Sequence, residues 1–291
     1  MYVQVVNAIL LARHFAPATE RTMLISMNKL NRRLMQLRDF GRMRAHCGWL
    51  HFICGRIGRG SGFASSWAKM IQNRLANHTH AEKAAFDQRH GTETHLRRDV
   101  STGQQSDGVE IRWGYSAICG DFLNEMLQSI PQPLSTYAFV DVGSGKGAGV
   151  LHASKFPFRR LCGIELTQEL IEIAQSNVDK FGVSTGRHLD VDWIHGDFFQ
   201  WAIPAEPQLF FMNYPFPHAL NIPALEYIET SRSNYPRPTL LVFRCAPSTT
   251  ANYLDQSELW RPIRLAPYWR VYACAKNVSR CASCSNFSAC N

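Results

Sequence analysis

The chain has 291 residues, which is enough for one large α/β domain and a smaller appendage. A composition of 45% hydrophobic and 19% charged residues is typical of a globular protein and argues against extensive disorder. No run reaches the ~18 apolar residues of a membrane span, and residues 1–12 lack the charged start and cleavage site of a secretory signal. We therefore expect a cytoplasmic protein, with an organellar transit peptide as the alternative.

The net charge of +8 is unevenly distributed. Residues 1–80 hold twelve Lys and Arg against two acids, a net +10, so residues 81–291 sum to −2. Apolar residues three and four apart between Leu24 and Leu37 indicate an amphipathic helix. We predict that residues 1–80 form a basic helical N-terminal extension. It either contacts a polyanion or another acidic partner, or is a solvated helical appendage.

A domain with alternating strands and helices is predicted over residues 81–275. A helix is expected from Ser65 through Ala85, residues 101–108 read as a polar loop, and a helix is expected from Ile118 to Ser129, before two prolines. Five strands and three helices then alternate, as a parallel doubly wound sheet requires. The predicted strands are Ala138–Val142, Arg160–Glu165, Val191–His195, Gln208–Asn213 and Thr239–Arg244, and the helices are Gly147–Ser154, Glu169–Lys180 and Ala219–Thr230.

The end of this domain has the pattern of an antiparallel hairpin, with apolar residues within 263–266 and 269–274. The fold class is therefore α/β, a doubly wound, Rossmann-like sheet of seven strands closed by this hairpin. Residues 276–291 form a predicted Cys-rich tail. With Cys274, four cysteines crowd the last 18 residues and could hold zinc, but only one C-x-x-C is present, so we predict a reduced tail and no metal site.

The most informative motif is Phe139–Gly147, a short apolar strand that runs into three glycines at alternate positions. Gly143, Gly145 and Gly147 permit a tight turn in which a Cβ would collide with a ligand, and the next helix offers unpaired N–H groups. The spacing differs from the G-x-G-x-x-G of dinucleotide binders. Asp141, two residues before the first glycine, suits a ligand that carries an ammonium group. The motif thus favours S-adenosylmethionine.

Acidic residues at the ends of the next two strands complete the predicted cofactor site. Glu165 lies 24 residues after Asp141, near the spacing of an acid that binds both ribose hydroxyls. Asp197 follows the third strand and is expected to accept from the adenine amine, with Phe198 packed on the base. The alternative for each acid is a helix-cap or loop carboxylate.

The chain resembles class I S-adenosylmethionine-dependent methyltransferases. The resemblance includes the Phe139–Gly147 motif and extends from about Phe86 to Ala275. With Pro157–Arg160, Gly163–Leu166 and an upstream Phe86–Thr94, the chain is similar to an uncharacterised bacterial-type group of these methyltransferases. The core also resembles the non-SET histone-lysine methyltransferases. Those enzymes place a tyrosine-led segment before the glycine turn, here beginning at Tyr115, and an asparagine-aromatic motif after strand four.

The resemblance implies where the methyl acceptor binds. Asn213-Tyr-Pro-Phe216 follows the fourth strand, so Asn213, Tyr214 and Phe216 are the candidate catalytic residues; a turn that caps the strand is the alternative. The motif partly resembles the Asn-Pro-Pro-Tyr signature of enzymes that methylate planar amides and amino bases, but its second residue is tyrosine. Upstream, Arg89 is a candidate for the cofactor carboxylate, and Tyr115 matches a cofactor-side tyrosine by position.

These observations predict a methyltransferase that uses S-adenosylmethionine and transfers a methyl group to an amine nitrogen. A protein or other macromolecule is favoured as the acceptor, with a nucleobase or small molecule as the alternative. A different possibility is a catalytically silent cofactor-binding module whose basic arm binds polyanions. Because the sulfonium provides its own leaving group, the protein mainly aligns the nucleophile and excludes water, so no general base is required.

Overall fold

The computed structural model describes residues 79–96, 98–106, 109–266 and 268–274. Residues 1–78 of the predicted extension lie outside this part of the chain, and so does the whole predicted Cys-rich tail, residues 276–291. The polyanion contact and the zinc alternative therefore stay predictions. Residues 79–90 are helical, so the domain boundary predicted at residue 80 falls within a helix, and that helix continues beyond its predicted end at residue 85.

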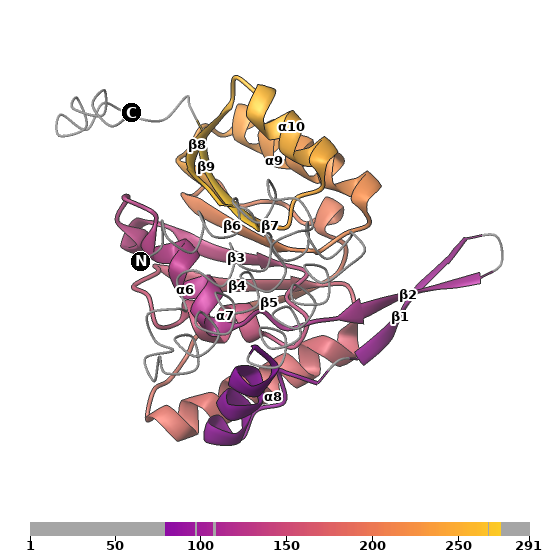
Figure 1. Cartoon of the computed structure of the whole chain (residues 1–291), viewed down its shortest axis with the longest axis vertical. Helices are drawn as coiled ribbons and strands as arrows, with labels where there is room; N and C mark the ends of the chain where they lie inside the picture. The colour runs from indigo at the N-terminus through magenta and orange to yellow at the C-terminus, as the bar shows by residue number, and fades with distance from the viewer. Residues whose placement is uncertain (1–78, 97, 107–108, 267, 275–291) are drawn as a thin grey trace, which may run out of the picture. The chain divides into compact units, whose positions relative to one another are not determined.

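The predicted seven-stranded sheet is confirmed (Figure 1). Its strand order is β5-β4-β3-β6-β7-β9-β8; the first five strands are parallel, and β9 and β8 form the closing antiparallel hairpin. The five parallel strands have the bounds expected from the sequence. The strands are β3 (Ala138–Val142), β4 (Arg160–Glu165), β5 (Val191–His195), β6 (Gln208–Asn213), β7 (Thr239–Arg244), β8 (Trp260–Leu265) and β9 (Trp269–Cys274).

Helices cover both faces of the sheet. They are α6 (Gly120–Gln128), α7 (Ala148–Ala153), α8 (Gln168–Thr185), α9 (Asn221–Asn234) and α10 (Ser248–Gln256), with short 3-10 helices η3 (Leu134–Thr136), η4 (Phe198–Gln200) and η5 (His218–Leu220). The sequence did not predict α10. This helix begins with Ser-Thr-Thr and has few apolar residues, so its periodicity is weak. Among the helices that the structure describes, none combines the length and apolar character needed to cross a membrane.

Two hydrophobic layers result from the alternation of side chains along the strands. Phe139 and Phe211 pack on one face with residues of α6 and α7, whereas Val140 and Phe210 pack on the other face with residues of α9 and α10. Because both faces are buried, the strands read as continuous apolar runs, which is typical of parallel sheets. This is why the strands were the most predictable elements of the chain.

The prediction of a polar loop over residues 101–108 was wrong for residues 101–106, and residues 107 and 108 lie outside the described part of the chain. Strands β1 (Arg98–Ser106) and β2 (Val109–Tyr115) form a separate antiparallel pair. Residues of β1 are mostly Ser, Thr, Gln and Gly, so they lack the apolar alternation by which a strand is recognised. The available sequence signal was the dipeptide Asp107-Gly108, which is favoured in two-residue hairpin turns.

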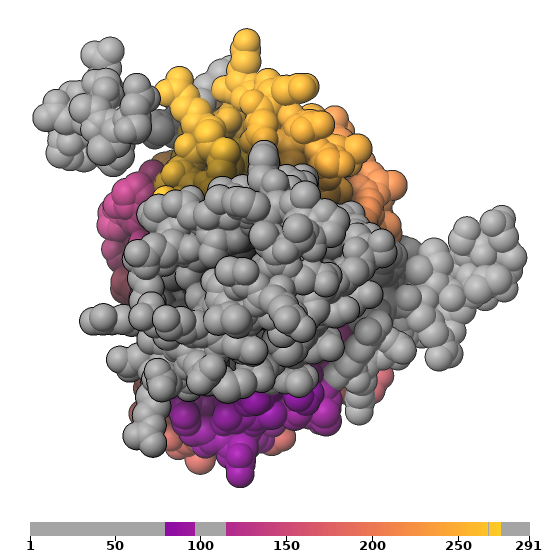
Figure 2. Space-filling model, viewed as in Figure 1, coloured from indigo at the N-terminus to yellow at the C-terminus, as the bar shows by residue number. Residues whose placement is uncertain are grey.

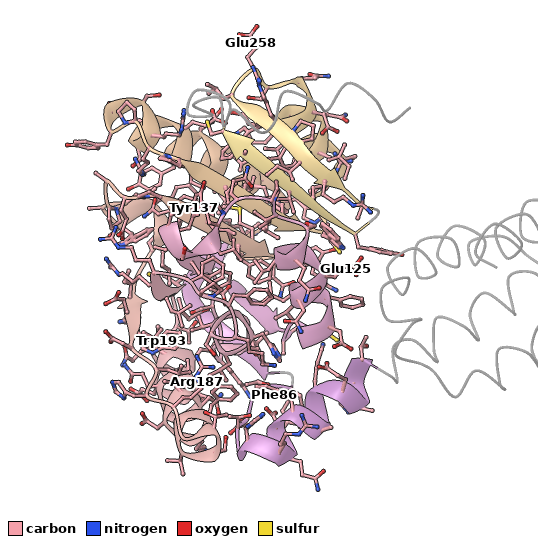
Figure 3. The ribbon with its side chains drawn as sticks, turned by 90° about the vertical axis from the view of Figure 1, so that its left-hand side faces the viewer. Phe86, Glu125, Tyr137, Arg187, Trp193 and Glu258 are labelled. Carbon is pink, nitrogen blue, oxygen red and sulfur yellow. The ribbon has the colours of Figure 1, made fainter. Side chains whose placement is uncertain are left out.

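The helix of residues 79–90 packs against α8. Phe86 is 6% exposed and stacks on Phe181 of α8 with ring centroids 5.8 Å apart. In the space-filling view the described residues before the sheet, in indigo, lie at the opposite end from the yellow C-terminal strands and helices (Figure 2). Phe86 and Trp193 lie toward this same end, far from Glu258 (Figure 3). The upstream segment is thus a part of the packed domain.

Asp87 organises the chain that follows this helix. Its carboxylate accepts hydrogen bonds from the Thr92 hydroxyl at 2.6 Å, from the Thr94 N–H at 2.7 Å and hydroxyl at 2.8 Å, and from the His95 N–H at 2.8 Å. Burial alone would raise the pKa of this carboxyl, but the hydrogen bonds from Thr92, His95 and Thr94 together hold it below 3.8. The structural role of Asp87 is therefore to hold residues 92–95 in place.

We predict that Asp87→Asn lowers the free energy of unfolding by about 3 kcal/mol at pH 7, because an amide has one accepting oxygen in place of two and the hydrogen bonds to a charged acceptor would be lost. Since the folded-state pKa is depressed, the stabilisation is present above pH 3.8 and is lost as the pH falls through the folded-state pKa. Urea unfolding at pH 7 and pH 3 tests this. Asp179→Asn, an exposed carboxylate on α8, is the control, and an equal effect of both substitutions would contradict the prediction.

Candidate functional site

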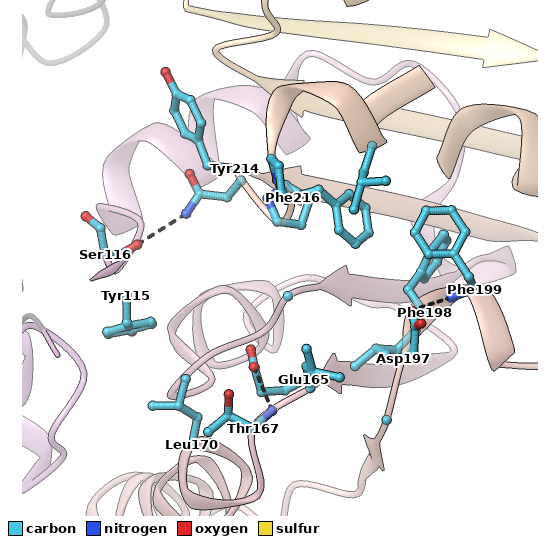
Figure 4. A pocket seen from close by; sticks show the side chains of 18 of the residues that line it. Tyr115, Ser116, Glu165, Thr167, Leu170, Asp197, Phe198, Phe199, Tyr214 and Phe216 are labelled. Carbon is cyan, nitrogen blue, oxygen red and sulfur yellow. Dashed lines mark hydrogen bonds between the residues drawn. The ribbon is translucent and has the colours of Figure 1, made fainter. Parts of the chain in front are cut away.

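A cavity of about 760 Å³ opens at the carboxyl ends of the parallel strands (Figure 4). It is the place where ligands of open α/β sheets bind. In Figure 4, Glu165, Thr167 and Leu170 lie on one side and Tyr214 and Phe216 across from them. The cavity is also lined by Tyr115, Ser116, Gly143, Asp197, Phe198, Phe199, Asn213, Pro215 and Arg244.

The glycine turn adopts the left-handed backbone that its residues allow. Gly143, Gly145 and Gly147 have φ of 70°, 54° and 81°. A Cβ on Gly145 would lie 2.3 Å from the ring of Tyr115, and one on Gly143 would lie 3.0 Å from Pro215. Of the three, only Gly143 lines the cavity. Within the protein itself, an added Cβ would thus meet Tyr115 or Pro215, while a collision with a ligand stays a prediction.

Glu165 ends β4 and joins the turn to the cavity. Its Oε2 accepts from the Gly145 N–H at 2.9 Å and its Oε1 accepts from the Thr167 N–H at 3.0 Å. Burial raises the pKa of this carboxyl, against the effect of those hydrogen bonds. Each carboxylate oxygen can accept two hydrogen bonds. Its position is thus fixed by backbone donors on both oxygens, and the carboxylate still lines the cavity.

Asp141 does not line the cavity. It is 3% exposed, and a Cβ on Gly149, in α7, would lie 2.3 Å from its Oδ2. Burial and the nearby charge of Glu165 raise the pKa of Asp141 well above 3.8, while a hydrogen bond from the Val150 N–H opposes the shift. The carboxyl thus faces the start of α7, which is the helix-cap alternative considered for this acid. A direct contact with a ligand ammonium stays a prediction.

Asp197 and Phe198 both line the cavity after β5. The Oδ1 of Asp197 accepts from the Phe199 N–H at 3.0 Å and caps η4. Phe198 is 3% exposed, and its ring centroid lies 5.7 Å from that of Phe216. This end of the cavity therefore combines one carboxylate with a wall of aromatic rings, an arrangement suited to a planar base with an amine.

Tyr115 braces the glycine turn from the opposite side. Its hydroxyl donates to the Thr94 carbonyl at 2.9 Å, and the Lys146 ammonium lies 5.6 Å from the centre of its ring. The side chain of Lys146 is fully buried and bonds to Glu93 at 2.7 Å. These contacts hold residues 93–94 against the turn. They also fix the side chain of Tyr115, which lines the cavity.

Asn213 and Arg244 end the neighbouring strands β6 and β7 and are direct partners in the register. Arg244 donates from Nη1 to the Asn213 Oδ1 at 3.0 Å, and Asn213 Nδ2 donates to the Ser116 carbonyl at 3.4 Å. Because a guanidinium can only donate, it fixes which end of the amide is the oxygen. One lone pair and one N–H of the amide remain for another group.

Two strained residues follow these strand ends. Tyr214 and Cys245 have φ of 56° and 52°, and they are the only non-glycine residues with positive φ in the part of the chain that the structure describes. Such backbone costs about 1–3 kcal/mol per residue and clusters at functional sites. Partial burial and a hydrogen bond to the Cys245 thiol raise the pKa of Tyr214 to about 12, so its phenol stays protonated at neutral pH.

Arg89 is not brought to the cavity. It is exposed on the helix of residues 79–90 and is not among the lining residues. The neighbouring His90 bonds through Nδ1 to the Ser184 hydroxyl at 2.8 Å and packs its ring on Phe181. The assignment of Arg89 to the cofactor carboxylate stays a prediction that no contact of the described residues supports.

Sequence reasoning missed Ser116, Thr167 and Arg244 as lining residues. Arg244 had a usable signal, because it is the last residue of a correctly predicted strand and the carboxyl ends of parallel strands meet at one edge. Thr167 follows Glu165 by two residues and could have been found in the same way. Ser116 contributes its carbonyl, which no side-chain pattern can reveal.

Comparison with known proteins gives structural similarity alone. No protein-family model matches the chain, and the search of curated proteins found no match. An RNA methyltransferase from Salinibacter ruber, in complex with S-adenosyl-L-homocysteine, is 21% identical with a TM-score of 0.34, over 52% of this chain and 88% of that one. A methyltransferase from Geobacter sulfurreducens is 19% identical with a TM-score of 0.38, over 54% and 77% of the two chains.

A predicted N6-adenine-specific DNA methylase from Listeria monocytogenes is also similar. It is 11% identical with a TM-score of 0.42, over 54% of this chain and 51% of that one. All three TM-scores lie below 0.5. The strand order and the closing hairpin, not these similarities, therefore define the fold.

We predict that Gly145→Ala destabilises the fold by about 3 kcal/mol or more, because it adds a clash with Tyr115 to the strain of a left-handed backbone. Gly186→Ala is the matched control: its φ is 64°, but nothing lies within 4 Å of an added Cβ. It should cost only about 1–2 kcal/mol. Chemical denaturation of both variants measures the difference, and equal losses would show that the Tyr115 contact has no energetic role.

Proposed function

We propose that this chain is an S-adenosylmethionine-dependent methyltransferase that acts on a nitrogen atom of a macromolecule, with a protein favoured as the acceptor. The proposal rests above all on Glu165, whose carboxylate is fixed by two backbone N–H groups and still lines the cavity. A cavity of this size lies within the ~300–1,000 Å³ of small-molecule sites. A cofactor and the end of an acceptor would share it.

The residues present fit the cofactor. The carboxylate of Glu165 lines the cavity and suits two adjacent ribose hydroxyls, because its two oxygens can only accept and each hydroxyl can donate. Asp197 uses only Oδ1 in the hydrogen bonds between described residues, so Oδ2 suits an adenine amine, and Phe198 and Phe199 suit its ring. When bound, S-adenosylmethionine supplies a methyl group on a sulfonium; the acceptor lone pair takes the methyl, the S–C electron pair stays on sulfur and the nitrogen releases one proton.

Asn213 lies where an acceptor nitrogen would be aligned. Its amide is held by Arg244 and by the Ser116 carbonyl, and the lone pair and N–H that remain can position a nucleophile. Positioning of this kind accounts for much of the rate when the leaving group needs no help. Phe216, which packs against Phe198 and Phe199, lines the same region and would exclude water from it, whereas Tyr214 is 53% exposed there.

A nucleobase is the second candidate acceptor. Asn213-Tyr-Pro-Phe216 and the rings around it would accommodate a planar amine as readily as a side chain of a protein. Labelled S-adenosylmethionine added with the purified chain to a lysate, then fractionated into protein, nucleic acid and small molecules, distinguishes the acceptors. Cofactor binding without label in any fraction would support the silent binding module instead.

We predict that Glu165→Gln weakens binding of S-adenosylhomocysteine by about 1.5–3 kcal/mol, because hydrogen bonds to a charged acceptor are lost. Isothermal titration calorimetry measures the dissociation constant directly. Glu172→Gln, an exposed residue of α8 outside the cavity, is the control. Circular dichroism must show that both variants fold; equal affinity of wild type and Glu165→Gln would refute the assignment of Glu165.

We predict that Asn213→Ala lowers the single-turnover rate of methyl transfer by roughly two orders of magnitude, because the nucleophile is misplaced, while cofactor affinity changes by less than about 1 kcal/mol. The two quantities are measured on the same preparation. A collapse of cofactor affinity together with the rate would assign Asn213 to the cofactor. No change in either would make the motif a simple strand cap.

A further inference from the structure

Arg244 is a cation at the acceptor side of the cavity. It is the last residue of β7 and the register partner of Asn213, so the sheet itself places the two side chains together. Both strands turn away through left-handed residues, Tyr214 and Cys245, immediately after them. The chain therefore accepts backbone strain at the two positions that present Asn213 and Arg244 to the cavity.

No acidic side chain among the described residues neutralises Arg244. It donates to the neutral amide of Asn213 at 3.0 Å, and its guanidinium lies 6.0 Å from the ring centre of Phe122. The ion pairs between described side chains do not include it. Its positive charge is thus held beside the cavity by uncharged groups.

The acids of the cavity, Glu165 and Asp197, belong to the opposite side, at the ends of β4 and β5. The cavity is accordingly polarised, with carboxylates where the cofactor is proposed to bind and a guanidinium where the acceptor is proposed to bind.

We propose that Arg244 is a specificity-determining residue that restricts the acceptor side to a reacting group without positive charge, and so excludes a protonated alkyl amine such as a lysine ammonium. The inference rests on the proposed function and narrows its acceptor to a nitrogen that is neutral near pH 7, such as an amide or an aromatic amine.

The physical reason is the position of the acceptor between two cations. The sulfonium of the proposed cofactor would lie on one side of it, and Arg244 lines the cavity on the other. Like charges a few ångströms apart repel by an amount that is large in a partly buried site, where the effective dielectric constant is far below that of water. An alkyl ammonium must also lose a proton before it has a lone pair to offer, and a guanidinium cannot take that proton. A neutral nitrogen meets neither obstacle and can use the free lone pair and N–H of Asn213.

The first experiment needs no acceptor. Calorimetry gives the affinities of wild type and Arg244→Gln for S-adenosylmethionine, which carries the sulfonium, and for S-adenosylhomocysteine, which does not. If Arg244 sets a positive potential in the cavity, Arg244→Gln should improve the affinity for the sulfonium relative to the thioether by about fivefold at low salt, and by less at high salt. Arg261→Gln, an exposed residue of β8, is the control and should leave the ratio unchanged.

The second experiment identifies the methylated group. Label transferred by the wild-type chain in lysate is hydrolysed and separated by the chemistry of the product. Label on amide or aromatic nitrogen is expected, and label recovered mainly as methyl-lysine overturns the inference. An unchanged affinity ratio in Arg244→Gln also overturns it. Failure of both ligands to bind the wild-type chain would instead refute the proposed function on which the inference depends.

Discussion

The site depends on one contact, the hydrogen bond from the Gly145 N–H to the carboxylate of Glu165. It joins the turn after β3 to the end of β4, and it is possible only because the two strands are parallel neighbours that end at the same edge. The left-handed φ of Gly145 aims its N–H at this carboxylate and leaves room for the ring of Tyr115. Local backbone geometry, strand pairing and the shape of the cavity are thereby coupled in a single interaction.

The upstream segment supports this contact from outside the sheet. Asp87 holds residues 92–95 by hydrogen bonds, Thr94 holds Tyr115, and Lys146 bonds to Glu93 from the glycine turn. Buried polar groups of this kind are stabilising only when they are satisfied, and here each has a partner. The part of the chain that precedes the sheet is therefore a structural support of the cavity.

The side of the cavity that Asn213 and Arg244 line is formed in a different way. Asn213 and Arg244 are presented by strand ends that are followed by strained non-glycine residues. Strain is retained in folded proteins where the surrounding structure enforces it, and it occurs frequently at sites of function. The two sides thus differ in kind: one is a glycine turn bound to a carboxylate, and the other is a pair of polar side chains held beside a charge.

The sequence alone determined the five parallel strands, the closing hairpin and the glycine turn. Buried parallel strands are continuous apolar runs, and the three glycines stand at alternate positions directly after the first of them. The polar strands β1 and β2 lack such a run, and the sequence did not predict them. It also placed Glu165, Asp197 and Asn213 at strand ends that meet at one edge. Only the tertiary structure decided that Asp141 faces α7, that Arg89 does not line the cavity and that Arg244 fixes the amide of Asn213. Those outcomes depend on side-chain direction and on contacts between residues far apart in the chain, which periodicity and spacing do not encode.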